Sequence, residues 1–247
     1  MIKAFVFDAY GTLYDTRSVS AVINAAFPGQ AGYISPVWRM KQLEYGWLRS
    51  MMGHYADFWT VTREALEYTL RTAGLDADEE LFEQVAQAYN QLSPYPDAAA
   101  ALRALSGYRC AILSNGSPGM LSALVRNSGL DGQLEKVISV DAKKVYKPDQ
   151  RAYALIEEEL GLPPSEIVFV SSNGFDICGA KQFGLTVARI ERITPAALTE
   201  DIRQTGGASP ATLYDALRSQ LEAHGAKPDH TIQSLSDLPG LAARLNA

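Results

Sequence analysis

The sequence has few of the residues that mark zinc proteins, disulfide-stabilised proteins or membrane proteins. It contains only two cysteines and three histidines in 247 residues. Cys110 and Cys178 lack the short Cys/His spacing of a zinc site, and their apolar surroundings indicate buried thiols. Residues 1–8 are too short an apolar run for a signal peptide, and no later run reaches the length of a membrane span. We therefore expect a cytoplasmic protein that does not act at a membrane.

Positive charge is also scarce. The 22 Lys and Arg residues are outnumbered by 28 Asp and Glu residues, and the formal net charge is -6. An acidic chain without a long basic run is a poor candidate for binding nucleic acid or an anionic membrane. Any small anion must be attracted by a local cluster of donors. Phosphate-binding loops and G-x-G-x-x-G fingerprints are missing, and His54, His224 and His230 have no serine or cysteine in a recognisable nucleophile elbow.

What the chain does contain is a series of short apolar runs separated by helix-like segments. The runs lack strict alternation, which is typical of parallel strands that are buried on both faces. The expected strands are residues 4–7, 110–113, 137–140, 167–170, 186–190 and 230–232, and the expected helices are residues 95–105, 118–128, 148–160 and 175–183. Gly129, Gly161 and Gly184 stand where three helices should end. The pattern predicts an α/β fold with a doubly wound parallel sheet, a Rossmann-like core.

A long helical block interrupts this rhythm. Residues 17–93 contain no clear strand and suggest helices at 37–51, 58–73 and 79–92. We therefore expect a helical cap domain at residues 15–94, inserted into a core formed by residues 1–14 and 95–247. A second helical excursion is expected at about 194–227, around a helix at 211–223, and a final helix should follow near 235–238.

Polar residues collect directly after the expected strands. Asp8 ends the first, Ser114-Asn115-Gly116 follows the second, Lys147 comes after the third, and residues 171–176 follow the fourth. Each has an ordinary interpretation: Asp8 could cap a helix, the two Asn-Gly pairs could form hairpin turns, and Lys147 could be solvated. Arg39, in the helical block, would normally lie on the surface. Ligands of open parallel sheets, however, bind beyond the carboxyl ends of the strands, so convergence there favours a reactive site.

The strand-end strings, in their order along the chain, resemble the motifs of the haloacid dehalogenase superfamily. They are Asp8-Ala9-Tyr10-Gly11-Thr12-Leu13, Ser114-Asn115-Gly116, Lys147-Pro148 and Ser171-Ser172-Asn173-Gly174-Phe175-Asp176. The string Trp38-Arg39-Met40-Lys41-Gln42-Leu43-Glu44-Tyr45 is similar to the cap of the bacterial L-2-haloacid dehalogenases. The resemblance extends from Met1 to about Arg192 and is weaker in the tail.

Most members of this superfamily are phosphatases, and two positions separate this chain from them. Phosphatases carry a second aspartate as general acid where this chain has Tyr10, and usually a magnesium-binding carboxylate at the position of Ser172. Asp8 and Asp176 beside Lys147 would form a weak magnesium site. We therefore expect no metal ion and no other cofactor.

The resemblance implies a role for each residue of the site. Asp8 would be the nucleophile, kept ionised by Lys147; Arg39, Asn115 and Phe175 would receive the halide; and Ser114 would hold the substrate carboxylate. The apolar side of the pocket would be formed by Tyr10, Leu43 and Phe58. Water for ester hydrolysis would be oriented by Asp176, Asn173, Ser171 and Lys147, with Thr12 and Tyr153 in support; whether Asp176 is the base or only orients the water stays open.

Three functions are compared for this sequence. The favoured one is hydrolysis of short-chain L-2-haloacids to D-2-hydroxyacids, with inversion, through an ester on Asp8. The alternatives are a magnesium-dependent phosphatase of the same superfamily and a non-catalytic binding module on this fold. The expected partners are a small 2-haloacid and a halide ion, and the resemblance together with the helical excursions suggests a homodimer. Preferred chain length and halogen stay open, including whether fluoroacetate is accepted.

Overall fold

The centre of the computed structural model, which describes residues 1–223 and 225–247, is a six-stranded parallel sheet in the order β3-β2-β1-β4-β5-β6. The strands are β1 (Ala4–Phe7), β2 (Arg109–Ser114), β3 (Lys136–Ser139), β4 (Ile167–Ser171), β5 (Thr186–Ile190) and β6 (His230–Ile232). Every strand pair is parallel. The expected doubly wound sheet is confirmed, and β3 begins and ends one residue earlier than expected. His224 lies outside the described residues.

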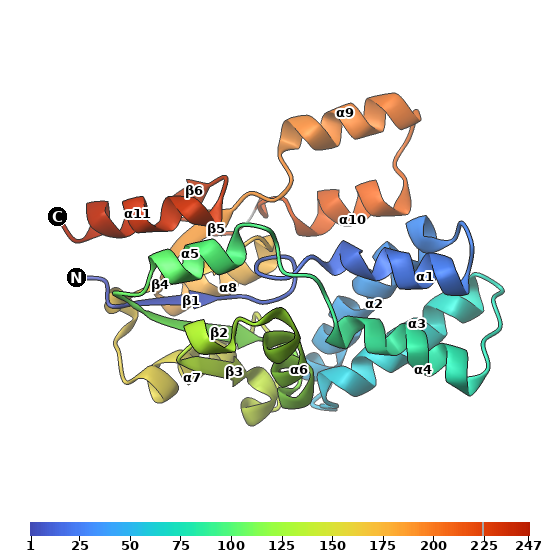
Figure 1. Ribbon diagram of the computed structural model, residues 1–247, viewed down its shortest axis with the longest axis horizontal. Helices are drawn as coiled ribbons and strands as arrows, with labels where there is room; N and C mark the ends of the chain where they lie inside the picture. The colour runs from blue at the N-terminus through green and yellow to red at the C-terminus, as the bar shows by residue number, and fades with distance from the viewer. Residues whose placement is uncertain (224) are drawn as a thin grey trace.

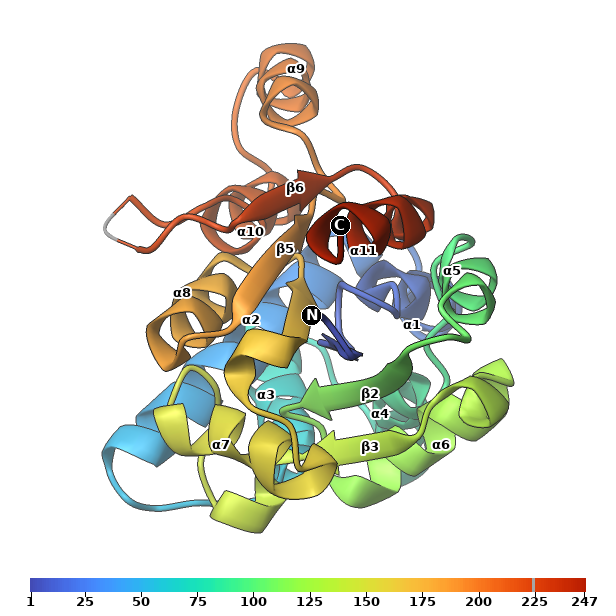
Figure 2. The ribbon, with the colours of Figure 1, turned by 90° about the vertical axis from the view of Figure 1, so that its left-hand side faces the viewer.

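Helices cover both faces of this sheet. In Figure 2, α5 (Ala98–Ala104), α6 (Pro118–Ser128) and α11 (Leu238–Leu245) lie on one face, and α7 (Gln150–Leu160) and α8 (Gly174–Phe183) lie on the other. All four residues of β1 are 0% exposed, which explains why this strand is apolar throughout. Gly129, Gly161 and Gly184 cap α6, α7 and α8 in the left-handed conformation, as expected. Short 3-10 turns connect several elements: Thr16–Val19, Ala88–Asn90, Asp131–Gln133, Val140–Lys143, Pro164–Glu166 and Leu235–Asp237.

The block between β1 and β2 is helical, and it lies beside the sheet rather than on either face (Figure 1). It consists of α1 (Ser20–Ala26), α2 (Ala31–Met51), α3 (Phe58–Thr72) and α4 (Glu79–Gln87). Asp57 and Asp78 cap α3 and α4 by accepting backbone N–H bonds, which fixes where these helices start. The Trp38 indole donates to the Thr62 carbonyl at 2.8 Å and joins α2 to α3.

Two details of this block differ from the sequence-based expectation. Helix α2 begins at Ala31, well before the expected start at residue 37, and contains Pro36 in its interior. Proline usually marks the first turn of a helix, so its presence concealed the true start. The expected helix at 79–92 ends as an α-helix at Gln87 and continues as a 3-10 turn, and α1 was not expected at all.

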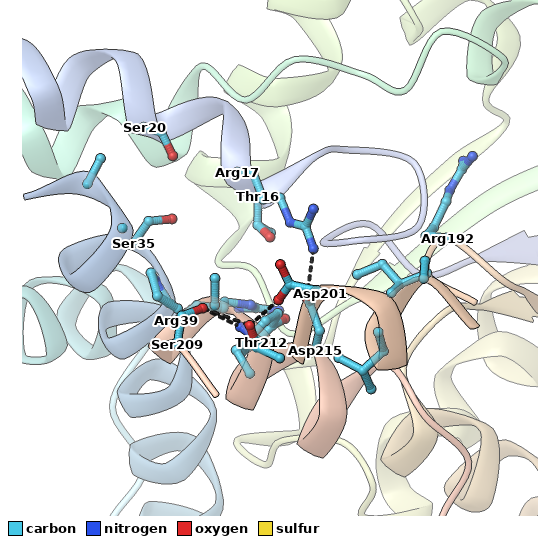
Figure 3. A pocket seen from close by; sticks show the side chains of 18 of the residues that line it. Thr16, Arg17, Ser20, Ser35, Arg39, Arg192, Asp201, Ser209, Thr212 and Asp215 are labelled. Carbon is cyan, nitrogen blue, oxygen red and sulfur yellow. Dashed lines mark hydrogen bonds and ion pairs between the residues drawn. The ribbon is translucent and has the colours of Figure 1, made fainter. Parts of the chain in front are cut away.

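The excursion after β5 contains two helices where the sequence suggested one at 211–223. They are α9 (Pro195–Thr205) and α10 (Pro210–Arg218). Helix α9 buries no residue, and its only large apolar side chains are Leu198 and Ile202, whose four-residue spacing is too short a pattern to indicate a second helix. Helices α1 and α2 on one side and α9 and α10 on the other line a cavity of about 730 Å³ that is open to solvent (Figure 3).

The cysteines divide between two environments. Cys110 is buried in the sheet, as expected, and burial raises its pKa to about 12. Cys178 lies on α8 and is only partly buried. Gly225, in the loop that leads to β6, packs against its sulfur. The expectation of two buried thiols is therefore wrong for Cys178. Within the described ranges, no helix is both long enough and apolar enough to cross a bilayer.

Candidate active site

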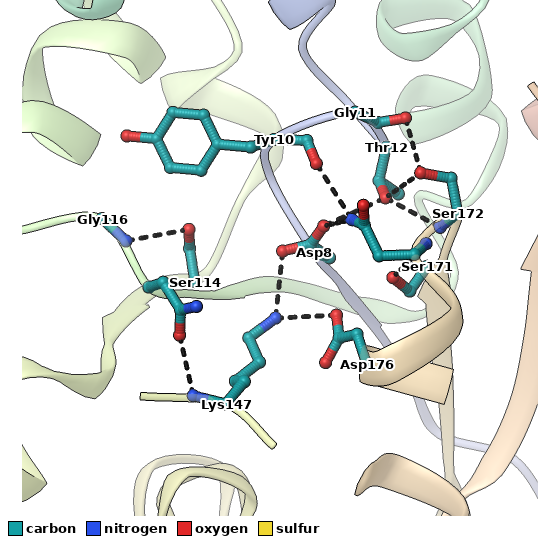
Figure 4. A network of polar contacts seen from close by, with 12 residues as sticks. Asp8, Tyr10, Gly11, Thr12, Ser114, Gly116, Lys147, Ser171, Ser172 and Asp176 are labelled. Carbon is teal, nitrogen blue, oxygen red and sulfur yellow. Dashed lines mark hydrogen bonds and ion pairs between the residues drawn. The ribbon is translucent and has the colours of Figure 1, made fainter. Parts of the chain in front are cut away.

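The Asp8 carboxylate occupies the carboxyl end of β1 and is held by bonds to both of its oxygens (Figure 4). Its Oδ1 accepts from Lys147 Nζ at 3.0 Å. Its Oδ2 accepts from Asn173 Nδ2 at 2.8 Å and from the Thr12 hydroxyl at 3.2 Å. Asp8 is 5% exposed. The carboxylate is therefore desolvated and fixed in orientation, the condition under which a carboxylate becomes an effective nucleophile.

Lys147 bridges two carboxylates. Its ammonium lies 3.0 Å from Asp8 and 2.9 Å from Asp176, and its side chain is 1% exposed. Burial alone would lower the pKa of Lys147, but the negative charges of Asp176 and Asp8 outweigh it and raise the pKa. Its backbone N–H donates to Asn115 Oδ1 at 2.9 Å, which fixes the segment that carries it. Lys147 is thus a permanent cation at the centre of the site.

Asp176 is fully buried in the first turn of α8, and burial raises its pKa while the Lys147 ammonium opposes the rise. The Tyr153 hydroxyl donates to its Oδ1 at 2.7 Å. This close approach depends on Gly179, because a Cβ there would lie 2.3 Å from the Tyr153 hydroxyl oxygen. Sequence reasoning missed Gly179; its position three residues after Asp176, on the same side of the helix, was the available signal.

Serine hydroxyls brace the loops that follow the strands. Ser171 Oγ accepts from the Asn173 backbone N–H at 3.2 Å, and Ser114 Oγ accepts from the Gly116 N–H at 3.2 Å. Ser172 Oγ donates to the Gly11 carbonyl at 2.8 Å. The Ser172 N–H also donates to the Thr12 hydroxyl, which ties the loop after β4 to the loop after β1. These bonds set the backbone on which the reactive side chains stand.

Arg39 reaches the site from α2 and is 4% exposed, so the ordinary interpretation of this arginine as a surface residue is wrong. Its guanidinium carbon lies 5.2 Å from the centre of the Tyr10 ring and 6.0 Å from that of Phe58. One terminal nitrogen donates to Gln42 Oε1 at 3.1 Å, and Nε has no hydrogen-bond partner in the described part of the chain. Leu43, 2% exposed, follows one turn later.

The three residues expected to receive a halide are not yet in mutual contact. Across residues 1–223 and 225–247, no hydrogen bond joins Arg39 to Asn115, and its ring contacts are with Tyr10 and Phe58 rather than Phe175. Phe175 instead packs edge-on against Trp47 of α2, with ring centres 5.2 Å apart. The Trp47 indole donates to the Lys147 carbonyl at 3.0 Å. Nothing in the sequence indicated this contact between Trp47 and the core.

The two carboxylates of the site form ion pairs with the Lys147 ammonium. In the parts of the chain that the structure covers, no three side chains of His, Cys, Asp or Glu come together as metal ligands. Asp8 and Asp176 both direct an oxygen at Lys147. The arrangement pairs two buried carboxylates with one ammonium, and the guanidinium of Arg39 stands over the rings of Tyr10 and Phe58 beside them.

Comparison with known proteins connects this geometry to a family. The model of the haloacid dehalogenase-like hydrolases matches residues 2–184. The chain is 55% identical to an (S)-2-haloacid dehalogenase of Xanthobacter autotrophicus over 98% of its own length and 95% of that protein. It is 43% identical to an (S)-2-haloacid dehalogenase of Pseudomonas sp. (strain YL), covering 90% and 94%.

A solved structure agrees along the same length. The L-2-haloacid dehalogenase of Xanthobacter autotrophicus with chloropropionic acid covalently bound superposes with a TM-score of 0.94 and 54% identity, over 98% of this chain and 99% of that one. This chain therefore shares its whole architecture with that enzyme, including the sheet that carries Asp8 and the helical block beside it. The chain belongs to the haloacid dehalogenase-like hydrolase family.

Proposed function

We propose that this chain is a hydrolase of carbon–halide bonds, an (S)-2-haloacid dehalogenase that converts short-chain L-2-haloacids to D-2-hydroxyacids through an ester on Asp8. The observation that carries the proposal is the buried Asp8 carboxylate, which Lys147 and Asn173 hold beside Tyr10, the residue whose ring faces Arg39 of α2. The proposal draws further support from relatives that are (S)-2-haloacid dehalogenases and from one whose structure has chloropropionic acid covalently bound.

In the first step, an Asp8 oxygen attacks C2 of the haloacid from the face opposite the halide. The new bond joins this oxygen to C2, and the electron pair of the carbon–halide bond leaves with the halide, so the configuration at C2 inverts. Burial strips water from the carboxylate, and its fixed orientation supplies much of the advantage over reaction in solution. Lys147 balances the charge of the carboxylate before attack.

Charge develops on the departing halide, and we assign its stabilisation to Arg39, Asn115 and Phe175. Arg39 is suited to this because its Nε is buried and has no hydrogen-bond partner among the described residues. Asn115 Nδ2 is the donor on the core side, since its Oδ1 accepts from Lys147. Movement of Phe175 away from Trp47 would complete the cradle.

The substrate itself needs a polar and an apolar contact. We assign its carboxylate to Ser114 and to the backbone N–H groups near Tyr10, which lie at the same edge of the sheet. Tyr10, Leu43 and Phe58 supply the apolar wall, and all three are nearly fully buried. A small alkyl group at C2 would pack against these side chains.

In the second step, water attacks the ester carbonyl carbon of Asp8. We assign Asp176 as the base that takes the proton from this water, because burial raises its pKa and so strengthens it as a base. Tyr153 and Lys147 orient Asp176. The water is oriented by Asn173 and Ser171, and Thr12 supports the Asp8 oxygen. The carbon–oxygen bond to the substrate then breaks, the departing alkoxide takes the proton from Asp176 and leaves as the D-2-hydroxyacid, and the remaining proton of the water is lost to solvent as the Asp8 carboxylate re-forms.

The phosphatase alternative has no observation in its favour. Tyr10 stands at the position of the second aspartate, and burial raises the pKa of its hydroxyl, which makes it a poor proton carrier at neutral pH. Ser172, at the position of the usual metal-binding carboxylate, donates to the Gly11 carbonyl. Both positions support carbon–halide rather than phosphate chemistry.

The domain division and the oligomeric state are further parts of the proposal. Residues 15–94 act as the cap that excludes water, and residues 1–14 and 95–247 form the core. We also propose a homodimer, because Met51 and Met52 at the end of α2 are 75% and 66% exposed, an unusual exposure for apolar side chains. Light scattering should give twice the mass of one chain, and a monomer at micromolar concentration would contradict the homodimer.

The proposal is tested by halide release from L-2-chloropropionate in the presence of a chelator. We expect release from the L isomer, formation of D-lactate, and no phosphate release from aryl phosphates with Mg²⁺. Asp8→Asn should abolish halide release, whereas Asp131→Asn, at an exposed position far along the chain, should retain it. In ¹⁸O-water, a single turnover should place the label in Asp8 before it appears in product. Phosphate release without halide release would refute the proposal.

A further inference from the structure

The proposed nucleophile is closed off from solvent. Asp8 is 5% exposed, Lys147 1% and Asp176 0%, so a haloacid must pass other side chains to reach them. Arg39 belongs to the site and also lines the cavity of about 730 Å³ between α1, α2, α9 and α10 (Figure 3). Cavities that take small-molecule ligands typically measure about 300–1,000 Å³, so this one can admit a small acid.

One face of α2 runs from the mouth of this cavity to its inner end. Gly32, Ser35, Pro36 and Arg39 all line the cavity. Their spacing of three and four residues places them on the same face of the helix. Gly32 is exposed, whereas Ser35 is 8% and Arg39 4% exposed. The lining therefore leads from solvent to the guanidinium that stands over Tyr10.

The charges along the cavity favour an anion at the inner end. Arg17 is paired with Asp215 at 2.5 Å, and Arg192 is paired with Asp97 at 2.9 Å. Asp201, the other carboxylate of the lining, is exposed on α9 and accepts from the Thr212 hydroxyl, so its charge lies at the solvent side. Arg39 has no ion pair with a carboxylate among the described residues, and its buried Nε has no hydrogen-bond partner there. A buried cation without a counter-ion, surrounded by walls of low dielectric constant, attracts a small anion strongly.

We propose that this cavity is the passage through which the haloacid anion enters and the halide and hydroxyacid leave, with Arg39 at its inner end. The inference rests on the proposed function and adds to it a route and a role for the excursion at 194–227. Helices α9 and α10 form the outer wall of the passage, and Tyr214 of α10 lines it together with Arg39. The same guanidinium would then receive the incoming carboxylate and release the departing halide.

A bulky side chain at the mouth should slow entry without changing the chemistry. Gly32→Trp serves this purpose, because a Cβ at Gly32 meets no atom within 4 Å and the residue lines the cavity. Gly119→Trp is the matched control: Gly119 is also the second residue of a helix, is exposed, and has equally open surroundings, but it lies on α6.

We expect kcat/KM for L-2-chloropropionate to fall about tenfold in Gly32→Trp and to stay within about twofold in Gly119→Trp. The loss should be larger for 2-chlorobutyrate than for chloroacetate. Rapid-quench measurement of ester formation at saturating substrate should give the wild-type rate. The proposed passage would be overturned if kcat/KM is unchanged in Gly32→Trp or falls equally in both variants. It would also be overturned if the rate of ester formation in Gly32→Trp falls as much as kcat/KM does.

A second measurement does not depend on activity. Wild-type crystals soaked in sodium bromide should show an anomalous peak in the cavity beside Arg39, and a peak missing from this position would overturn the inference. If the wild type releases no halide from any haloacid, the proposed function fails. The bromide position then still shows whether a small anion enters this cavity and reaches Arg39.

Discussion

Lys147→Met is expected to destabilise the protein by an amount that depends on pH. The substitution keeps much of the side-chain volume but leaves Asp8 and Asp176 buried without their shared ammonium, which lies 3.0 Å and 2.9 Å from them. Removal of one partner from a buried ion pair costs about 3–5 kcal/mol. Because Lys147 serves two carboxylates, we expect the upper part of this range at neutral pH.

The sign of the pH dependence follows from Asp176. Burial already raises its pKa above the ordinary value of 3.8, and Lys147 opposes this rise, so loss of Lys147 raises the pKa further. A carboxyl group with a folded-state pKa above its unfolded value destabilises the fold once the pH exceeds the unfolded value. The deficit in unfolding free energy should therefore be small near pH 4 and grow toward pH 7.5.

The measurement is urea unfolding followed by tryptophan fluorescence at several pH values. The matched control is Lys143→Met, because Lys143 and its partner Glu158 are 32% and 51% exposed and such surface pairs contribute only about 0–1 kcal/mol. A Lys147→Met deficit no larger than that of the control, or one that grows as the pH falls, would refute this account of the buried triad.

Two further predictions concern the surroundings of Asp176. Tyr153→Phe removes the hydroxyl that donates to Asp176 at 2.7 Å, and this loss raises the pKa of the Asp176 carboxyl. The acidic limb of the pH profile of ester hydrolysis, measured in single turnovers, should therefore move to higher pH. A limb that does not move would contradict Asp176 as the base. Gly179→Ala should cost about 1–3 kcal/mol in urea unfolding, because its Cβ would lie 2.3 Å from the Tyr153 hydroxyl, whereas Gly119→Ala, which meets nothing within 4 Å, should stabilise by about 0.4–1 kcal/mol. Shifts of the same sign in both alanine variants would contradict the close-approach argument.

The strand ends could be predicted from sequence because their signal is local. An apolar run followed directly by Asp8, or by Ser171 and its neighbours, announces both the strand and the polar group that it delivers. Parallel pairing then brings these groups to one edge, as the bonds among Asp8, Lys147 and Asp176 show.

Other features had no local signal. In α9 only Leu198 and Ile202 mark one side of the helix, and neither is buried. The interior Pro36 concealed the start of α2. Arg39 stands in an amphipathic string in which a surface position is the ordinary outcome, and only the resemblance suggested its burial. Trp47 contacts Lys147, 100 positions away, and Gly179 faces Tyr153, 26 positions away, and such contacts depend on how the helices pack.

Helix α2 carries Arg39 and, about two turns later, Trp47, whose indole donates to the carbonyl of Lys147 itself. A rigid-body displacement of this helix would thus withdraw the proposed halide acceptor and at the same time break a bond to Lys147, the cation that pairs with the proposed nucleophile. Under the proposed mechanism, closure of the cap and positioning of Lys147 depend on the same helix, so a molecule with α2 displaced would lose both and would not react with its substrate.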